Sequence, residues 1–189
     1  MSSVRTDRLI LRPFSGDDLP HYAAMNADPE IMAYLGGPIT PQASWAQMEG
    51  ANQSWRDNGF GKIAVERAAD GTFMGMCGLS REPWDTDLEL GWRLARPFWG
   101  QGFASEAARA WLAHGFENLD LARIISIADV PHARSIAVMT RIGMTFDHTE
   151  TLDADGDVFE AVFYAITARA WRALPKTEKG KSRSGGVAP

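Results

Sequence analysis

A predicted strand that runs through two glycines into a predicted helix constrains the fold of this chain most. Residues 88–94 have strand character, and apolar residues recur at spacings of three and four from Ala104 to Phe116, which predicts one apolar helical face. Gly100 and Gly102 stand between the two elements. Glycine lacks a Cβ, and the free N–H groups at a helix start carry the positive end of the helix dipole. The junction is therefore a candidate pyrophosphate site.

The junction does not match either of two common phosphate-binding patterns. A dinucleotide fingerprint needs a third glycine where this chain has Ser105, and the Gly-Lys-Ser/Thr of a P-loop is absent from the sequence. The alternative interpretation is that the glycines only make a tight connection and that Trp92, Trp99 and Trp111 belong to the core. The local pattern alone leaves both interpretations open.

Length and composition restrict the class of protein. The 189 residues are enough for one domain, and the seven tryptophans provide large rigid surfaces for a core or a ligand cleft. No apolar run approaches the ~20 residues that a membrane helix needs, and the N-terminus lacks a hydrophobic signal region, so we expect a cytoplasmic protein. We expect residues 1–174 to form the domain and residues 175–189 to form a mobile basic tail.

The charge distribution favours cationic partners over nucleic acid. The net charge is −5, and because residues 175–189 carry four basic side chains against one acidic side chain, residues 1–174 carry −8. An acidic body without a basic helix disfavours nucleic acid and suits a partner such as a primary amine.

The single cysteine, Cys77, lies in an apolar strand-like run, which favours a structural thiol over a nucleophile. The four histidines show no metal-ligand spacing, so no metal site is predicted.

Hydrophobic periodicity and turn residues predict a mixed α/β order of elements. Asp70-Gly71 is a hairpin signal between two strands, and Thr40-Pro41 and Gly59 are start and stop signals of a helix. The predicted elements are a strand at 9–12, a helix at 17–26, a short helix after residue 29, a helix at 41–58, strands at 62–67, 72–79 and 88–94, a helix at 104–116, a strand at 124–128, a helix at 134–141, and strands at 144–151 and 158–167.

The segment ELGWRLARPFWGQGFASEA at residues 89–107 resembles the acyl-coenzyme A motif of the GNAT acetyltransferase superfamily. Gly102-Phe103-Ala104 supplies the second half of the family pattern Gln/Arg-x-x-Gly-x-Gly/Ala. Trp99 departs from its first position, as in the branch that acetylates the N-termini of ribosomal proteins. The resemblance extends to TDRLILRPF at 6–14, GFGKIAVE at 59–66, GMCGLS at 75–80 and the stretch 134–144, and it covers roughly residues 5–170. It implies a single-domain GNAT-like fold, with a mixed, mostly antiparallel sheet of six to seven strands flanked by helices on both faces.

The resemblance implies acetyl-coenzyme A as the co-substrate. In the family, the strand that here carries Trp92 and Leu94 diverges from its neighbour, and its free backbone groups bind the pantetheine amides; ordinary strand pairing is the alternative. The helix start would hold the pyrophosphate, and Arg96 would lie near the phosphates unless it is simply solvated. The implied cofactor-binding residues are Trp92, Leu94, Arg96, Gly100, Gln101, Gly102, Phe103, Ala104, Ser105 and His132.

Two residues are candidates for the proton transfers. Glu89 occupies the position where related enzymes place a carboxylate that removes the amine proton, although it could instead form a surface ion pair. The resembling branch opens a later helix with Asn-x-x-Ser, and the matching residues here are His132 and Ser135. Ser135 could donate a hydrogen bond to the departing sulfur or only cap the helix. The tyrosine that often serves as acid in the family is replaced by Met139.

These features predict an N-acetyltransferase that moves an acetyl group from acetyl-coenzyme A to a primary amine by direct transfer in a ternary complex. The acceptor would be a protein or peptide N-terminus or a small-molecule amine, and Trp84, Asp85 and Asp87 are the candidate acceptor-binding residues. The alternative is a catalytically decayed acyl-coenzyme A sensor module, which the replaced Asn and Tyr motivate. No membrane partner is expected, and the resemblance is compatible with a homodimer.

Overall fold

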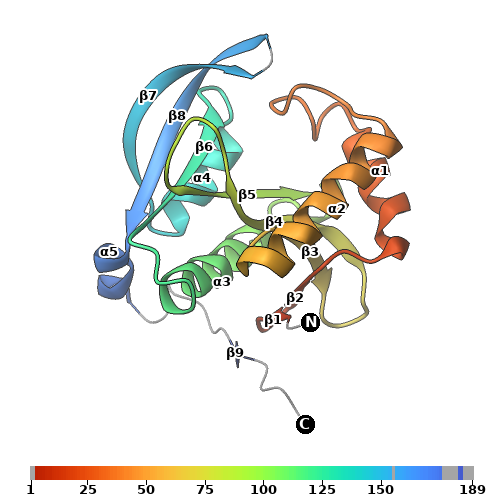
Figure 1. Cartoon of the computed structure of the whole chain (residues 1–189), viewed down its shortest axis with the longest axis horizontal. Helices are drawn as coiled ribbons and strands as arrows, with labels where there is room; N and C mark the ends of the chain where they lie inside the picture. The colour runs from red at the N-terminus through yellow and green to blue at the C-terminus, as the bar shows by residue number, and fades with distance from the viewer. Residues whose placement is uncertain (1–2, 155, 176–182, 185–189) are drawn as a thin grey trace.

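One twisted sheet runs through the centre of the molecule, and the apolar strands of the sequence form its middle (Figure 1). The computed structural model describes residues 3–154, 156–175 and 183–184. Within these residues the strand order is β7-β8-β6-β5-β4-β3-β2-β1-β9. The strands are β1 (Val4–Arg5), β2 (Leu9–Arg12), β3 (Lys62–Arg67), β4 (Phe73–Arg81), β5 (Leu88–Leu94), β6 (Arg123–Asp129), β7 (Thr145–Ala154), β8 (Asp157–Thr167) and β9 (Arg183–Ser184).

The predicted fold class is confirmed, with more strands than expected. Every neighbouring pair is antiparallel except β5 and β6, which are parallel. Eight strands lie between residues 4 and 167, and the two-residue β9 pairs with β1. The prediction of six to seven strands missed the two-residue strands, because so short a segment has no periodicity to recognise. Apart from residues 175, 183 and 184, the predicted mobile tail lies outside the described residues.

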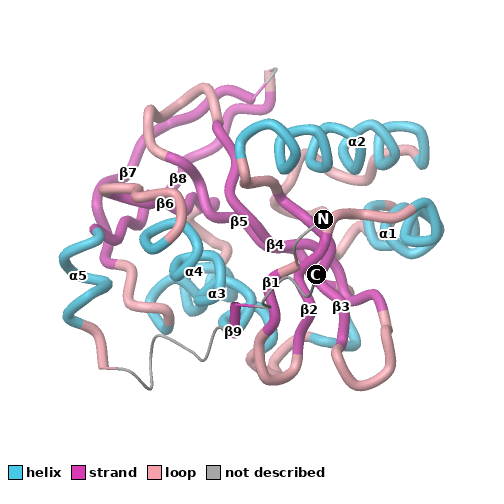
Figure 2. Tube along the Cα trace, turned by 60° about the horizontal axis from the view of Figure 1, so that its bottom comes forward, coloured by secondary structure: helices cyan, strands magenta, loops and turns pink. Residues whose placement is uncertain are grey.

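Helices cover both faces of the sheet (Figure 2). On one face lie α1 (Leu19–Asn26) and α2 (Pro41–Asn58), and on the other lie α3 (Phe103–Glu117) and α4 (Ala133–Arg141), while α5 (Ala168–Ala173) follows β8. The alternation of β3 explains the two layers: Ile63 packs into the core with α3, and Ala64 packs with residues of α1 and α2. No helix of the described residues is long and apolar enough to span a bilayer.

Most predicted boundaries agree with the structure to within a few residues. Thr40 caps α2 by accepting a hydrogen bond from the N–H of Ala43 (3.1 Å), and Gly59 ends it at φ +74°. The short helix predicted after residue 29 is wrong. Residues 29–37 form turns instead, and Gly36 and Gly37 both adopt left-handed φ values, which interrupt a right-handed helix. The first turn of the helix predicted at 17–26 is the 3₁₀ turn η1 (Gly16–Asp18), which precedes α1, and neither α5 nor the 3₁₀ turn η2 (Arg96–Phe98) was predicted.

The strands β5 and β6 diverge after a short contact, as the family resemblance implied. Within these two fully described strands, the registered pairs are Leu88 with Ile124 and Glu89 with Ile125. The hydroxyl of Ser126 then donates a hydrogen bond to the carbonyl of Leu90 (2.8 Å). On its other edge β5 stays paired with β4 through Leu94. One edge of β5 beyond residue 90 is therefore free of a neighbouring strand.

Candidate active site

A large cleft opens where β5 and β6 diverge. Its volume is about 1960 Å³, and its walls come from both faces of the sheet, the start of α3, α4, α2 and the turns before α2. Ordinary small-molecule pockets have volumes of roughly 300–1,000 Å³. The cleft therefore has room for two reactants.

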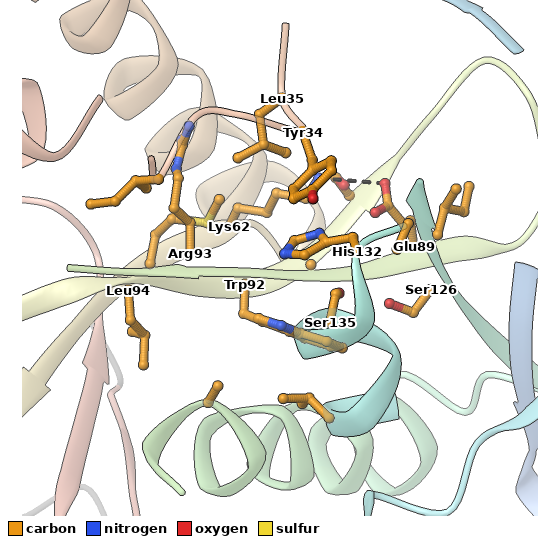
Figure 3. A pocket seen from close by; sticks show the side chains of 18 of the residues that line it. Tyr34, Leu35, Lys62, Glu89, Trp92, Arg93, Leu94, Ser126, His132 and Ser135 are labelled. Atoms are coloured by element: carbon orange, nitrogen blue, oxygen red, sulfur yellow. Dashed lines mark hydrogen bonds and ion pairs between the residues drawn. The ribbon is translucent and has the colours of Figure 1, made fainter. Parts of the chain in front are cut away.

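The alternation of β5 divides the cleft into two halves (Figure 3). Trp92 and Leu94 lie on the side of α3, and Arg93 lies on the opposite side, toward α2. We call the first side, lined by residues 99–105 and by α4, the α3 half. We call the second side, lined by Tyr22, Gln47, Lys62, Glu82, Glu89 and Arg93, the α2 half.

Glycines at two left-handed positions shape the start of α3. Gly100 has φ +72°, and Gly102, the N-cap residue, has φ +80°. The first intrahelical bond runs from the N–H of Glu106 to the carbonyl of Gly102 (3.0 Å), so the N–H groups of residues 103–105 have no partner within the helix. The indole of Trp99 donates to the carbonyl of Leu94 (2.7 Å) and anchors the turn to β5. The junction therefore has the backbone conformation that was predicted for an anion-binding site.

Two side chains at this junction are engaged in contacts with other residues of the chain. The amide of Gln101 donates to the carbonyl of Pro97 (2.7 Å), and Phe103 is buried beneath the guanidinium of Arg8 (4.3 Å). Gln101 and Phe103 therefore offer backbone groups to a ligand while their side chains serve the fold.

The cations beside the helix start differ from the predicted one. Arg96 forms ion pairs with Asp28 (2.8 Å) and Glu30 (3.2 Å) and does not line the cleft. Arg134 and Arg141 line it instead. They are seven residues apart on α4, and this helical spacing, which places both on one face, was the signal that sequence reasoning missed.

These two arginines contact residues of the α3 junction. The Arg134 guanidinium lies 4.0 Å from the centre of the Trp99 ring, and Arg141 approaches the hydroxyl of Ser105 (3.4 Å). Ser105 was predicted to offer its hydroxyl to a phosphate, but its side chain is buried against Arg141. Arg141 therefore stands where a phosphate oxygen could replace the serine hydroxyl as its partner.

Glu89 lies at the point of divergence, in the α2 half. Its side chain is only 12% exposed and forms an ion pair with Lys62 (3.4 Å), which also contacts Glu82 (3.1 Å). Burial raises the pKa of Glu89, and the nearby positive charge of Lys62 opposes this shift. Burial would lower the pKa of Lys62, but the charges of the two carboxylates outweigh it and raise that pKa, so Lys62 stays an ammonium group. A carboxylate with a raised pKa is suited to accept a proton near neutral pH.

The start of α4 brings His132 and Ser135 to the cleft. The His132 ring stacks on Tyr34 (4.4 Å between centroids), and burial, followed by the charge of Arg134, lowers the pKa of His132, which favours the neutral ring. Ser135 is buried and lines the cleft. Met139, the residue at the family's tyrosine position, is fully buried in the core.

The three predicted acceptor-binding residues are separated in the structure. Trp84 lines the cleft and packs with a cluster that includes Ile127 and Phe159. Asp85 and Asp87 do not line it, because both face Arg123, at 3.8 and 2.6 Å. These two aspartates hold the loop between β4 and β5 in place.

Cys77 and the histidines show no reactive arrangement among the described residues. Cys77 is fully buried, and burial raises the pKa of its thiol, which disfavours the nucleophilic thiolate. No group of three His, Cys, Asp or Glu side chains in the described part of the chain is placed to hold a metal ion.

Comparisons with known proteins agree with the fold. The family model for the acetyltransferase (GNAT) domain matches residues 8–145. FsC-acetyl coenzyme A-N(2)-transacetylase of Aspergillus fumigatus is 31% identical over 198 residues, which cover 96% of this chain and 83% of that protein. The crystal structure of an acetyltransferase from Agrobacterium tumefaciens has a TM-score of 0.77 and 30% identity, and the match covers 88% of this chain and 94% of that chain.

The ribosomal-protein branch suggested by the Trp99 pattern is not confirmed. A Bacillus subtilis protein provisionally named as the ribosomal N-acetyltransferase YdaF is 30% identical over 105 residues, which cover 54% of this chain and 57% of that protein. That match is partial and does not fix a branch. The match to the domain model covers most of the chain, and the chain therefore belongs to the GNAT acetyltransferase family.

Proposed function

We propose that the protein is an acetyl-coenzyme A dependent N-acetyltransferase that transfers the acetyl group directly to a primary amine. The observation that carries this proposal is the position of Glu89, a largely buried carboxylate with a raised pKa at the divergence of β5 and β6. Both halves of the cleft meet at this point, so one group there can contact an amine while the acyl donor lies along β5.

The α3 half fits coenzyme A. The edge of β5 beyond residue 90 that has no neighbouring strand offers backbone groups to the pantetheine amides, in the way that an added strand would be bound, while the carbonyl of Leu94 is already bonded to the indole of Trp99. The free N–H groups of residues 103–105, with Arg134 and Arg141, suit the phosphates. Acetyl-coenzyme A would supply an activated thioester whose carbonyl carbon an amine can attack.

The α2 half supplies the proton acceptor. As the amine nitrogen forms the new C–N bond and the C–S bond breaks, Glu89 takes the amine proton and Ser135 donates a hydrogen bond to the departing sulfur. The positive charge of Lys62 opposes the effect of burial and favours the ionised form of Glu89, which can accept the proton. His132, neutral and stacked on Tyr34, shapes the wall between the two halves.

The acceptor, the location and the assembly of the protein remain proposals. The FsC-acetylating relative and the partial match to YdaF keep both small-molecule amines and protein N-termini among the candidate acceptors. We expect a cytoplasmic protein, and a homodimer would have the exposed edge of β7 available for pairing.

Substitution of Glu89 tests the proposal. Glu89→Gln should lower acetyl-coenzyme A dependent thiol release with an accepted amine by about 10²–10⁴-fold, because the proton acceptor is lost. Acetyl-coenzyme A affinity, measured by isothermal titration, should be unchanged.

Glu82→Gln is the matched control, because it makes the same change of charge in the same cluster and should preserve most of the turnover. Full turnover in Glu89→Gln would remove Glu89 from the mechanism. Acetyl-coenzyme A binding by the wild type without thiol release from any amine would favour the sensor alternative.

A further inference from the structure

Arg93 is a buried cation whose partners in the α2 half are all neutral. Its side chain is 8% exposed and points away from Trp92 and Leu94 (Figure 3). Its guanidinium donates to the hydroxyl of Tyr22 (2.7 Å), the side-chain oxygen of Gln47 (3.3 Å) and the sulfur of Met32 (2.9 Å). Its Nε is buried and has no hydrogen-bond partner among the described residues.

Two other partly buried arginines of the described residues are paired with carboxylates. Arg12 contacts Asp18 (2.6 Å) and Glu66 (2.6 Å), and Arg123 contacts Asp87 (2.6 Å). No described Asp or Glu lies within ion-pair distance of Arg93. Burying a charge without a counter-charge is unfavourable, so an arginine at a cleft wall without a carboxylate partner requires an explanation.

A ligand can reach this group, because Arg93, Tyr22, Met32 and Gln47 all line the cleft. A guanidinium has five N–H donors, and the three bonds described here, one of them to a weak sulfur acceptor, leave two donors without a partner. Because Nη2 already donates to Tyr22 and Gln47 and Nε is buried, a carboxylate would bind through one oxygen to Nη1 in a charge-assisted hydrogen bond.

Arg93 lies on the same strand as the proposed proton acceptor, Glu89. Glu89, Gly91 and Arg93 lie on the same side of β5, and residues four apart on a strand are separated by about 13 Å. The stem of Lys62 covers Gly91 between them, since a Cβ at that glycine would lie 2.8 Å from its Cε. An acceptor held with its amine at Glu89 would therefore extend over Lys62 toward Arg93.

We propose that Arg93 is an anion subsite of the acceptor half, and that the acceptor is a primary amine that also bears a carboxylate about 10 Å from the amine. This inference rests on the proposed transferase function. A carboxylate fits better than a phosphate, because one guanidinium balances one negative charge and Lys62 is already engaged by Glu82 and Glu89. The hydroxyl of Tyr22 and the amide of Gln47 would complete the polar surroundings of the carboxylate.

Competition between matched acceptors tests the subsite. ω-Amino acids from 6-aminohexanoate to 12-aminododecanoate are mixed with their primary amides, and the acetylated products are quantified in one reaction. The wild type should acetylate the best-fitting carboxylate about ten- to a hundred-fold faster than its amide, the range typical of a charge-assisted hydrogen bond. Equal rates for acid and amide at every chain length would overturn the proposal.

Gln47→Glu is the informative variant, because it places a competing carboxylate beside Arg93 without removing the arginine. The preference for acids should fall to near equality in Gln47→Glu and in Arg93→Met, whereas Arg12→Met, with its own carboxylate partners, should keep the preference. The ratio of products is independent of the folded fraction of each variant. Retention of the wild-type ratio in Gln47→Glu and Arg93→Met would overturn the proposal.

A binding measurement separates this proposal from the transferase function. Saturation-transfer NMR compares octanoate with octanamide on protein saturated with coenzyme A. Octanoate binding that is lost in Gln47→Glu would support the subsite even if no amine is acetylated. A failure to acetylate any amine would count against the transferase function alone. Equal binding of octanoate and octanamide would overturn the subsite.

Discussion

The two halves of the cleft are built from different parts of the chain. The α3 half consists mainly of backbone groups, namely the free edge of β5 and the first turn of α3. The α2 half contains four charged side chains, which come from β3, β5 and the residue after β4, namely Lys62, Glu82, Glu89 and Arg93. A backbone site depends on local conformation, whereas a side-chain site depends on the balance of charges. The two halves should therefore respond to different substitutions.

A change of conformation should damage the α3 half most. Gly102→Ala forces an alanine into φ +80° at a cost of about 1–2 kcal/mol and displaces the N–H groups of the first turn of α3. We expect acetyl-coenzyme A affinity to fall about ten-fold, measured by isothermal titration.

Gly71→Ala is the control for this strain. Gly71 also adopts a left-handed φ (+74°) and has open space around its Cβ position, but it lies in the hairpin between β3 and β4. Both variants should lose similar stability in urea unfolding, and only Gly102→Ala should lose affinity. A similar loss of affinity in both variants would contradict the phosphate role of the α3 start.

Removal of one hydroxyl should affect turnover rather than binding. Ser135→Ala removes the proposed hydrogen bond to the departing sulfur, and the turnover number should fall about ten-fold while acetyl-coenzyme A affinity stays constant. Ser44→Ala removes a different buried hydroxyl, which lies on α2, and should leave turnover unchanged. Wild-type turnover in Ser135→Ala would leave the serine with a structural role only.

The charge balance of the α2 half should be visible in the pH profile. Glu89 accepts a proton only when it is ionised, so kcat/KM should rise with pH through its raised pKa. Lys62→Met removes the charge that lowers this pKa, and the rise should move to higher pH. Glu82→Gln removes a charge that raises it, and the rise should move to lower pH. Shifts of the same sign in the two variants would contradict the assignment of Glu89.

The smallest effect is expected at Ser105. Its hydroxyl is buried against Arg141, so Ser105→Ala should change acetyl-coenzyme A affinity by less than about two-fold. Arg141→Met should lower the affinity by several-fold, since it removes a cation from the phosphate end of the cleft. If Ser105→Ala lost more acetyl-coenzyme A affinity than Arg141→Met in such a titration, the result would support the hydroxyl contact predicted from the sequence.

The difference between the two halves also explains what could be predicted from the sequence. The α3 half follows from one continuous segment, so the strand at 88–94, the glycine turn and the helix start were all recognisable. The α2 half requires knowledge of the sheet order, which places Lys62 and Glu82 beside Glu89. Only Glu89 of these three was identified, and it was identified through the family resemblance.

The errors in predicted residues have the same physical origin. Arg96, Asp85 and Asp87 are near the cleft in sequence, but each has a partner that comes from elsewhere in the chain. Conversely, Arg134 and Arg141 are distant in sequence from the glycine turn and reach it through the packing of α4 beside α3. Local patterns identify backbone sites, but they do not reveal which charges are already neutralised.

Isothermal titration of acetyl-coenzyme A and free coenzyme A into the purified protein, followed by thiol release with a panel of amines, tests the transferase assignment most directly. We expect micromolar binding of both ligands and thiol release that depends on an amine. Absence of binding would contradict the anion site at residues 100–104, and with it the proposed function of the cleft.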